Sequence, residues 1–241
     1  MILTTYLTSL PDPQRRRNVR VAPNDHGLMQ LHPGCSRHRA ELVILHDELH
    51  DQFTSIYENH STCFIKVAKC PAYSLNDWRF FLFRDLLADG FAPSDEVVWI
   101  SDLFDVRLNR HPDEMVEIYD DDLFIGRQPW CYDQATRRGR NHCKQMVRWY
   151  GEVLPAVAGQ PILMAGTWGG RRKTVLRFLT KLCKEIEDLQ PGVPGNCNMA
   201  AFNKVAYCNI GRDGFWCEGE PLHSVLGTRD TDNKRVAFVH K

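Results

Sequence analysis

Two aspartates, Asp102 and Asp105, follow a strand-like apolar run in the segment VVWISDLFDVRL (97–108). Aspartate is common in turns and at helix caps, so a purely structural role fits the local pattern. Two carboxylates at a strand end are also hard oxygen donors that can hold Mg²⁺ or Mn²⁺, with water and phosphate oxygens in the other positions. The spacing D-x-x-D leaves both interpretations open. One aspartate can bind the metal while the other accepts a hydrogen bond from a hydroxyl.

A histidine and a lysine, His240 and Lys241, close the sequence in the segment FVHK. A frayed and solvated terminus is the ordinary interpretation of such residues. Because the residues before the histidine are apolar, we expect a terminal strand that is tied to the core. A histidine held there can be a third metal ligand, and the lysine can act as a point charge for a phosphate.

Arginines that could contact a phosphate occur in two places. Arg79 and Arg84 lie on a predicted helix over 77–88, and a cluster of three arginines (15–17) follows the first predicted strand. Arginines usually lay their stems on the core edge and keep the charge in water. The alternative is a direct contact with a diphosphate.

The run AGTWGGRRK (165–173) is rich in glycine. It matches neither GxxxxGK[ST] nor GxGxxG, so the two common nucleotide-binding fingerprints are excluded there. We expect a strand over 161–166 that stops at Gly166, followed by a helix over 171–189. The turn between them is either a simple connection or a close approach of the backbone to a sugar or phosphate.

Alternating strand and helix patterns predict an α/β fold, with a mostly parallel central sheet flanked by helices, in a single domain over 1–241. The expected strands are 2–8, 41–47, 62–69, 95–101, 122–128, 161–166 and 235–241. The expected helices are 77–88, 140–150, 171–189 and 198–207, with 19–40 irregular. Ligands of such sheets bind outside the carboxyl ends of strands. Thr8-Ser9, His46-Asp47 and the two aspartates fall at those ends.

Composition narrows the classes of partner. The formal net charge is zero, with 30 basic and 30 acidic residues, which argues against a non-specific nucleic-acid binder. None of the nine cysteines forms a CxxC pair, so a zinc finger is not expected. No apolar run approaches ~18 residues, so the sequence predicts no transmembrane segment. We expect a cytoplasmic protein with mostly free thiols.

Several segments, taken in order, resemble small metal-dependent glycosyltransferases of the GT-A fold, the type found in bacterial surface-polysaccharide and large-virus glycan clusters. The segments are YLTS (6–9), RFFLFRDLL (79–87), WISDLFDVRLNRHP (99–112), ILMAGTWGG (162–170), NMAAFN (198–203), GEPLHS (219–224) and FVHK (238–241). The resemblance implies a GT-A-like fold, a nucleotide-sugar donor (a UDP-sugar first), a glycan acceptor and Mn²⁺ or Mg²⁺. The start on a strand and the end on His-Lys suggest one module of a longer enzyme, fused to other glycosyltransferase domains.

The resemblance assigns roles on the donor side. In such enzymes the end of the first strand holds the nucleoside, which here points to Thr8, Ser9 and Asp47. The aspartate motif holds metal and donor, which points to Asp102 and Asp105. Asp105 ends the motif and is the expected direct ligand.

Two further roles follow from the same resemblance. A histidine near the C-terminus completes the metal site, which points to His240, with His223 as the rival. The glycine-rich segment shapes the acceptor side, and its members are Gly166, Thr167, Trp168 and Gly169.

One position departs from the family pattern. Relatives often have aspartate where this chain has Asn198, and asparagine cannot act as a general base. Asp133 and Glu220 are other carboxylates that could be nominated. Two alternatives stay open: a sugar-phosphate nucleotidyltransferase, although no glycine-rich loop follows the first strand, and a carbohydrate-binding module with weakened chemistry. The sequence does not separate a retaining from an inverting reaction.

Overall fold

The structure is a computed structural model that describes residues 1–11, 20–22, 25–69, 72–93, 96–119, 121–190, 195–210, 216–218 and 236–240. Its strands are β1 (Ile2–Tyr6), β2 (Leu42–His46), β3 (Thr62–Lys66), β4 (Val97–Ser101), β5 (Val106–Leu108), β6 (Leu123–Cys131), β7 (Pro161–Arg171), β8 (Trp216–Glu218) and β9 (Phe238–His240). Its helices are α1 (Asp25–His38), α2 (Asp51–Tyr57), α3 (Leu75–Ala88), α4 (Glu114–Ile118), α5 (Arg137–Tyr150), α6 (Arg172–Leu189), α7 (Asn198–Lys204) and the π-helix η2 (Val205–Ile210).

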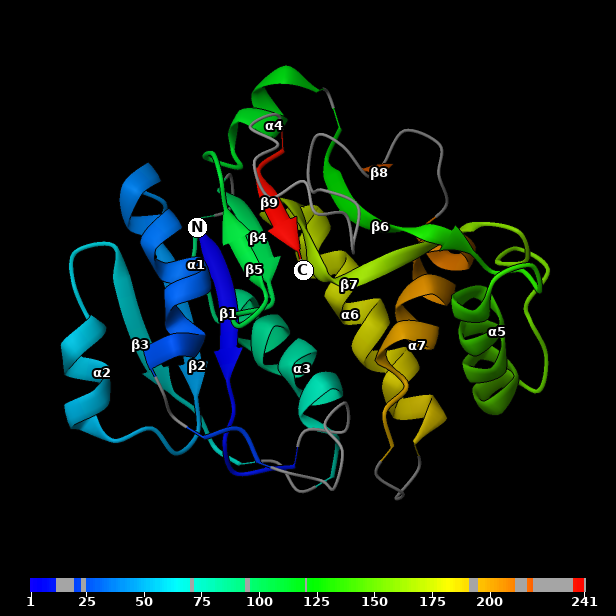
Figure 1. Cartoon of the computed structure of the whole chain (residues 1–241), viewed down its shortest axis with the longest axis horizontal. Coiled ribbons are helices and arrows are strands. Elements are labelled where there is room, and N and C mark those ends of the chain that lie inside the picture. The colour runs from blue at the N-terminus through cyan, green and yellow to red at the C-terminus, as the bar shows by residue number, and fades with distance from the viewer. Residues whose placement is uncertain are drawn as a thin grey trace.

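The main sheet has seven strands in the order β3-β2-β1-β4-β7-β6-β8 (Figure 1). Strand β7 runs antiparallel to β4 and β6, whereas the other neighbouring strands pair in parallel. Strands β5 and β9 form a separate antiparallel pair. The α/β class and the mostly parallel sheet are therefore confirmed.

The order in which strands are added to the sheet changes direction at β1. The chain passes from β1 outward to β2 and β3, then returns to place β4 on the other side of β1. Open α/β sheets bind ligands in the crevice at such a switch point, outside the carboxyl ends of the strands. The topology therefore directs attention to the segments that follow β1 and β4.

Both faces of the sheet are buried, which explains why its inner strands read as continuous apolar runs. Leu3, Val43 and Ile100 belong to a core that α3 and α6 complete. Their chain neighbours Ile2 and Trp99 point to the opposite face and pack in a core with residues of α1, β5 and β9. Fully burying one such apolar side chain contributes about 1.5–3 kcal/mol.

The prediction of an irregular segment over 19–40 is wrong, because α1 occupies most of it. Pro33 lies inside this helix, and Gly34 packs against β5. A Cβ at Gly34 would lie 2.8 Å from Leu108 Cβ, so the glycine permits a close approach of helix and strand. Tertiary packing here outweighs the low helix propensity of proline and glycine.

The strand predicted over 161–166 does not stop at Gly166. Strand β7 continues to Arg171, and the glycine-rich run pairs with β4. A Cβ at Gly169 would lie 2.6 Å from Trp99 Cα, so glycine serves close strand packing rather than a turn. The expected loop at this position is therefore wrong.

Smaller corrections concern helix ends. Helix α3 begins at Leu75, two residues before the predicted start, and is capped by Ser74, whose hydroxyl accepts from the Asp77 N–H at 3.2 Å. Helix α5 begins at Arg137, three residues before the predicted start, because Thr136 caps it. The free cysteines of the described part of the chain include Cys35, Cys63, Cys131, Cys143, Cys183, Cys197 and Cys208. No described helix combines the length and the apolar character needed to cross a membrane.

Candidate metal site and ligand cavity

Three side chains from distant parts of the chain meet at the end of β4. Asp102 follows β4, Asp105 precedes β5, and His240 ends β9. The pairing of β5 with β9 sets Val106 opposite His240, which brings the imidazole to Asp105. His240 Nε2 lies 3.2 Å from Asp105 Oδ2 and 3.9 Å from Asp102 Oδ2.

The three residues have the donors and the spacing of a cation site. Each offers one ligand atom, and these atoms lie within 4.8 Å of one another. Two carboxylates and one imidazole suit a divalent metal that accepts both oxygen and nitrogen. The imidazole is buried, whereas the Asp105 side chain is half-exposed, so the triad is open to solvent on one side.

Arg79 of α3 forms an ion pair with Asp102. Its other terminal nitrogen donates to the Ala165 carbonyl at 3.3 Å. Burial would raise the pKa of Asp102, but the charges of Arg79 and His240 outweigh it and hold that pKa below its usual range. Asp102 is therefore held as a carboxylate.

The pKa of His240 is raised. Burial alone would lower it, but the hydrogen bond to Asp105 and the charges of both aspartates outweigh burial and the repulsion from Arg79. The second ring nitrogen, Nδ1, is buried and has no hydrogen-bond partner among the described residues. Phe238, fully buried near Trp99, anchors the strand that carries the histidine.

Gly166 of β7 leaves room for the Asp102 carboxylate. A Cβ at this position would lie 2.8 Å from Asp102 Cγ, well inside normal contact. The backbone is fixed as well, since the Asp102 N–H donates to the Gly166 carbonyl at 2.8 Å. Gly166, predicted on the acceptor side, is thus a close neighbour of the metal-ligand candidate.

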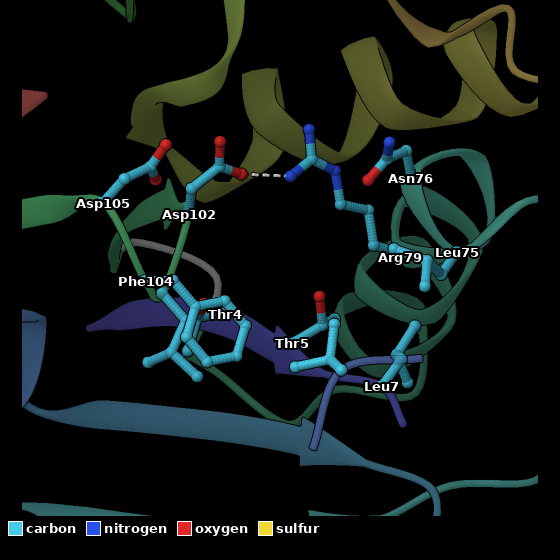
Figure 2. A pocket seen from close by; sticks show the side chains of 11 residues that line it. Thr4, Thr5, Leu7, Leu75, Asn76, Arg79, Asp102, Phe104 and Asp105 are labelled. Carbon is cyan, nitrogen blue, oxygen red and sulfur yellow. Dashed lines mark hydrogen bonds and ion pairs between the residues drawn. The ribbon is translucent and has the colours of Figure 1, made fainter. Parts of the chain in front are cut away.

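A cavity of about 310 Å³ lies beside the triad (Figure 2). Most of its lining residues come from β1, α3 and the segment after β4, with Leu7 just after β1 and Val21 before α1. They are Thr4, Thr5, Leu7, Val21, Leu75, Asn76, Arg79, Asp102, Leu103, Phe104 and Asp105. Figure 2 shows Arg79 reaching from α3 to Asp102, with Asn76 behind it and Phe104 across the opening. The cavity lies at the switch point between β1 and β4.

Buried polar atoms of the cavity lining are left unpaired. The Thr4 hydroxyl, the Asn76 side-chain NH₂ and the Arg79 Nε–H have no hydrogen-bond partner within the described ranges. A buried donor without a partner costs about 1–3 kcal/mol. The residues that carry these three donors line the cavity, so a polar ligand there is a candidate partner for them.

Thr8, Ser9 and Asp47 come together, but in a closed arrangement. Asp47 Oδ1 accepts from the Thr8 N–H at 2.8 Å, and Oδ2 accepts from the Ser9 N–H at 3.1 Å. Both hydroxyls also donate to the same carboxylate. These side chains do not line the cavity beside the triad; Asp47 instead borders a second, more open hollow of about 660 Å³.

Other predicted site residues lie elsewhere. Arg84 donates to Asp85 at 2.8 Å and lies over the Phe81 ring, so its described contacts stay on the helix side. Trp168 is buried in the core beside Phe178, with ring centroids 5.0 Å apart. The side chain of Thr167 is buried in β7 as well.

Asn198 and Asp133 do not line the cavity either. Asn198 is buried, and its side-chain oxygen accepts from the Met199 N–H at 2.6 Å, outside the cavity lining. Asp133 accepts from the N–H of Ala135 in the turn before α5. Several predicted residues lie outside the described ranges, and they are Arg15, Arg16, Arg17, Glu220, His223 and Lys241.

Sequence reasoning missed Thr4, Thr5, Asn76 and Phe104. The two threonines interrupt an apolar run in β1, and Asn76 stands in the first turn of α3. Polar residues inside an otherwise apolar strand were the available signal.

In comparisons with known proteins, no family model and no curated protein matches this chain.

Proposed function

We propose that the chain is a glycosyltransferase that moves a sugar from a nucleoside diphosphate-sugar to a hydroxyl of a glycan acceptor, with a divalent cation. One observation carries the proposal: the Asp102, Asp105 and His240 triad stands at the rim of a cavity whose buried donors are unpaired. A cation site beside a polar cavity suits a ligand with a phosphate at one end and a hydroxylated ring at the other.

The donor set favours Mn²⁺ over Mg²⁺, because Mg²⁺ prefers oxygen ligands whereas the triad includes an imidazole. Asp105 is the proposed direct ligand with His240, and Asp102 shares the site while paired to Arg79. A bound cation would stabilise the negative charge that grows on the diphosphate as the sugar leaves.

The cavity would hold the nucleoside or the sugar. Its volume of about 310 Å³ lies at the lower end of ligand pockets, which is the size of one ring system with its substituents. Thr4 and Asn76 would donate hydrogen bonds to the ligand. Phe104 offers an aromatic ring at the mouth, and Arg79 would direct its unpaired Nε–H toward the same space.

The experiment is an incubation of the chain with UDP-, GDP- and TDP-sugars and Mn²⁺, followed by a measurement of free nucleoside diphosphate. We expect release with one donor class, UDP-sugars first, that stops on chelation of the metal and in Asp105→Asn. No release and no Mn²⁺-dependent thermal shift with any donor would contradict the proposal. Pyrophosphate formed from a nucleoside triphosphate and a sugar phosphate would instead identify a nucleotidyltransferase.

A further inference from the structure

Helix α5 carries an unbalanced positive charge. Its 14 residues include Arg137, Arg138, Arg140, Lys144 and Arg148 and no acidic residue, although the whole chain has equal numbers of both. At about 100° per residue, four of the five fall within about 80° of the helix circumference. Only Arg138 lies off this stripe, which we call the basic stripe: Arg137, Arg140, Lys144 and Arg148.

The basic stripe faces solvent, and its charges are not neutralised by the described residues. All four side chains are exposed, and none forms an ion pair with a carboxylate in the described part of the chain. Arg140, Lys144 and Arg148 follow one another at four-residue spacing, where like charges destabilise a helix by about 0.2–0.5 kcal/mol per pair. No carboxylate among the described residues pairs with these side chains to offset the repulsion.

The opposite side of α5 is fixed to the protein. Cys143 and Met146 are buried in a small core with Tyr132 and Ile162. The helix therefore presents a rigid charged face and does not need to leave the protein to expose it. Figure 1 shows α5 at one end of the molecule, far from α1 and α2.

Apolar and aromatic groups flank the basic stripe. Val147 is 46% exposed, and the half-buried ring of Trp149 lies 5.3 Å from the Arg148 guanidinium carbon. Arg138 lies 5.6 Å over the half-buried Trp130 ring. Both tryptophan rings also pack against buried core residues, so the exposed apolar group beside the basic stripe is Val147.

We propose that the exposed face of α5 binds an anionic membrane surface through lipid phosphate groups. The stripe extends over twelve residues, 137–148, which is about 16 Å along a straight helix and lets all four charges reach one flat surface together. Clusters of four or more Lys and Arg on an amphipathic helix are typical of anionic-lipid binding. This inference is independent of the proposed function, and either can fail alone.

The test is co-sedimentation of the full chain with vesicles of phosphatidylcholine alone or of phosphatidylcholine mixed with phosphatidylglycerol. We expect binding to the mixed vesicles that weakens with added salt, and none to the neutral ones. The variant Arg137→Gln/Lys144→Gln/Arg148→Gln should bind the mixed vesicles about a hundredfold more weakly. It keeps Arg140, which donates to the Gln134 carbonyl and supports the turn before the helix.

The matched control is Arg37→Gln/Arg39→Gln/Lys66→Gln. It removes the same charge from exposed positions at the opposite end of the molecule and should retain vesicle binding. Equal losses in the two triple variants would overturn the proposal, because only net charge would then matter. Binding to a single-stranded oligonucleotide that depends on α5, with no binding to anionic vesicles, would overturn it in favour of a nucleic acid. Circular dichroism of both variants checks that the fold is kept.

Discussion

Polar side chains gather at two places along the carboxyl ends of the parallel strands, and the two places differ in how their polar atoms are paired. At Asp47 both carboxylate oxygens accept hydrogen bonds from Thr8 and Ser9, so the cluster closes on itself. At the cavity beside Asp102 the donors of Thr4 and Asn76 are buried and have no hydrogen-bond partner among the described residues. Position at a strand end therefore does not by itself mark a ligand site. Unpaired polar atoms on a cavity wall are the stronger indication.

The largest expected effect is the loss of the direct metal ligand. In Asp105→Asn, Mn²⁺-dependent binding of UDP should weaken by about a hundredfold or more, because a charged donor is lost. Isothermal titration measures the affinity. Asp51→Asn, an exposed aspartate beside the second hollow, is the control and should bind as the wild type does. If Asp105→Asn binds UDP and Mn²⁺ as tightly as the wild type, the D-x-x-D motif has only a structural role in a turn.

A smaller loss is expected in Gly166→Ala. The added methyl group meets the Asp102 carboxylate and pushes it from its place, so UDP–Mn²⁺ affinity should fall about tenfold. Gly169→Ala, on the same strand but against Trp99, is the control. Both variants should lose about 1–3 kcal/mol of stability to overpacking, and only Gly166→Ala should lose affinity. Equal affinities would show that β7 does not position Asp102.

Thr4→Val should separate the effect on stability from the effect on UDP affinity. The change removes a hydroxyl that has no partner in the described part of the chain. Urea unfolding should therefore show equal or greater stability, while UDP affinity falls about fivefold. Thr62→Val removes another buried, unpaired hydroxyl that lies outside the cavity lining, and should leave affinity unchanged. A parallel loss of affinity in both variants would contradict a ligand contact at Thr4.

Asp47→Asn should have its effect on stability alone. We expect about 1–3 kcal/mol of destabilisation at neutral pH, because the amide repels donors that the carboxylate accepted, with little change in UDP affinity. Burial would raise the pKa of Asp47, but the hydrogen bonds from Ser9 and Thr8 outweigh it and hold the pKa below 3.8.

The pH dependence of that variant follows from the lowered pKa. A carboxyl with a lowered folded-state pKa contributes stability above its unfolded pKa, and this is lost as the pH falls through the folded value. The difference in unfolding free energy between wild type and Asp47→Asn should therefore be constant from neutral pH to about 4 and shrink below it. If Asp47→Asn lowers UDP affinity as much as Asp105→Asn does, the nucleoside binds at the end of β1, beside Asp47, and not in the cavity.

Much of the fold could be predicted from the sequence because its strongest signals are local. The apolar runs of β1, β2 and β4 and the periodicity of α6 gave elements within a few residues of their true bounds. Helix α1 and the extension of β7 could not be predicted the same way. Gly34 and Gly169 mark close packing between distant segments, whereas local statistics assign glycine to turns and loops.

In the candidate site, too, local patterns could be predicted and contacts between distant segments could not. Asp102 and Asp105 were found because they follow a strand, and His240 because it ends an apolar segment. Their convergence depends on the pairing of β5 with β9, a contact between residues far apart in the sequence. Thr4 and Asn76 were missed, because only the three-dimensional structure shows that their polar atoms are buried and have no partner within the described ranges.

We propose that one cation and one nucleotide share the site between β1 and β4. Diffraction from crystals grown with Mn²⁺ and UDP, recorded for the anomalous signal of manganese, tests it most directly. We expect one manganese peak bonded to Asp105 and His240 and to the diphosphate, with the nucleoside beside Thr4 and Asn76. Ordered UDP with no manganese at the triad, or both ligands in the hollow beside Asp47, would contradict it.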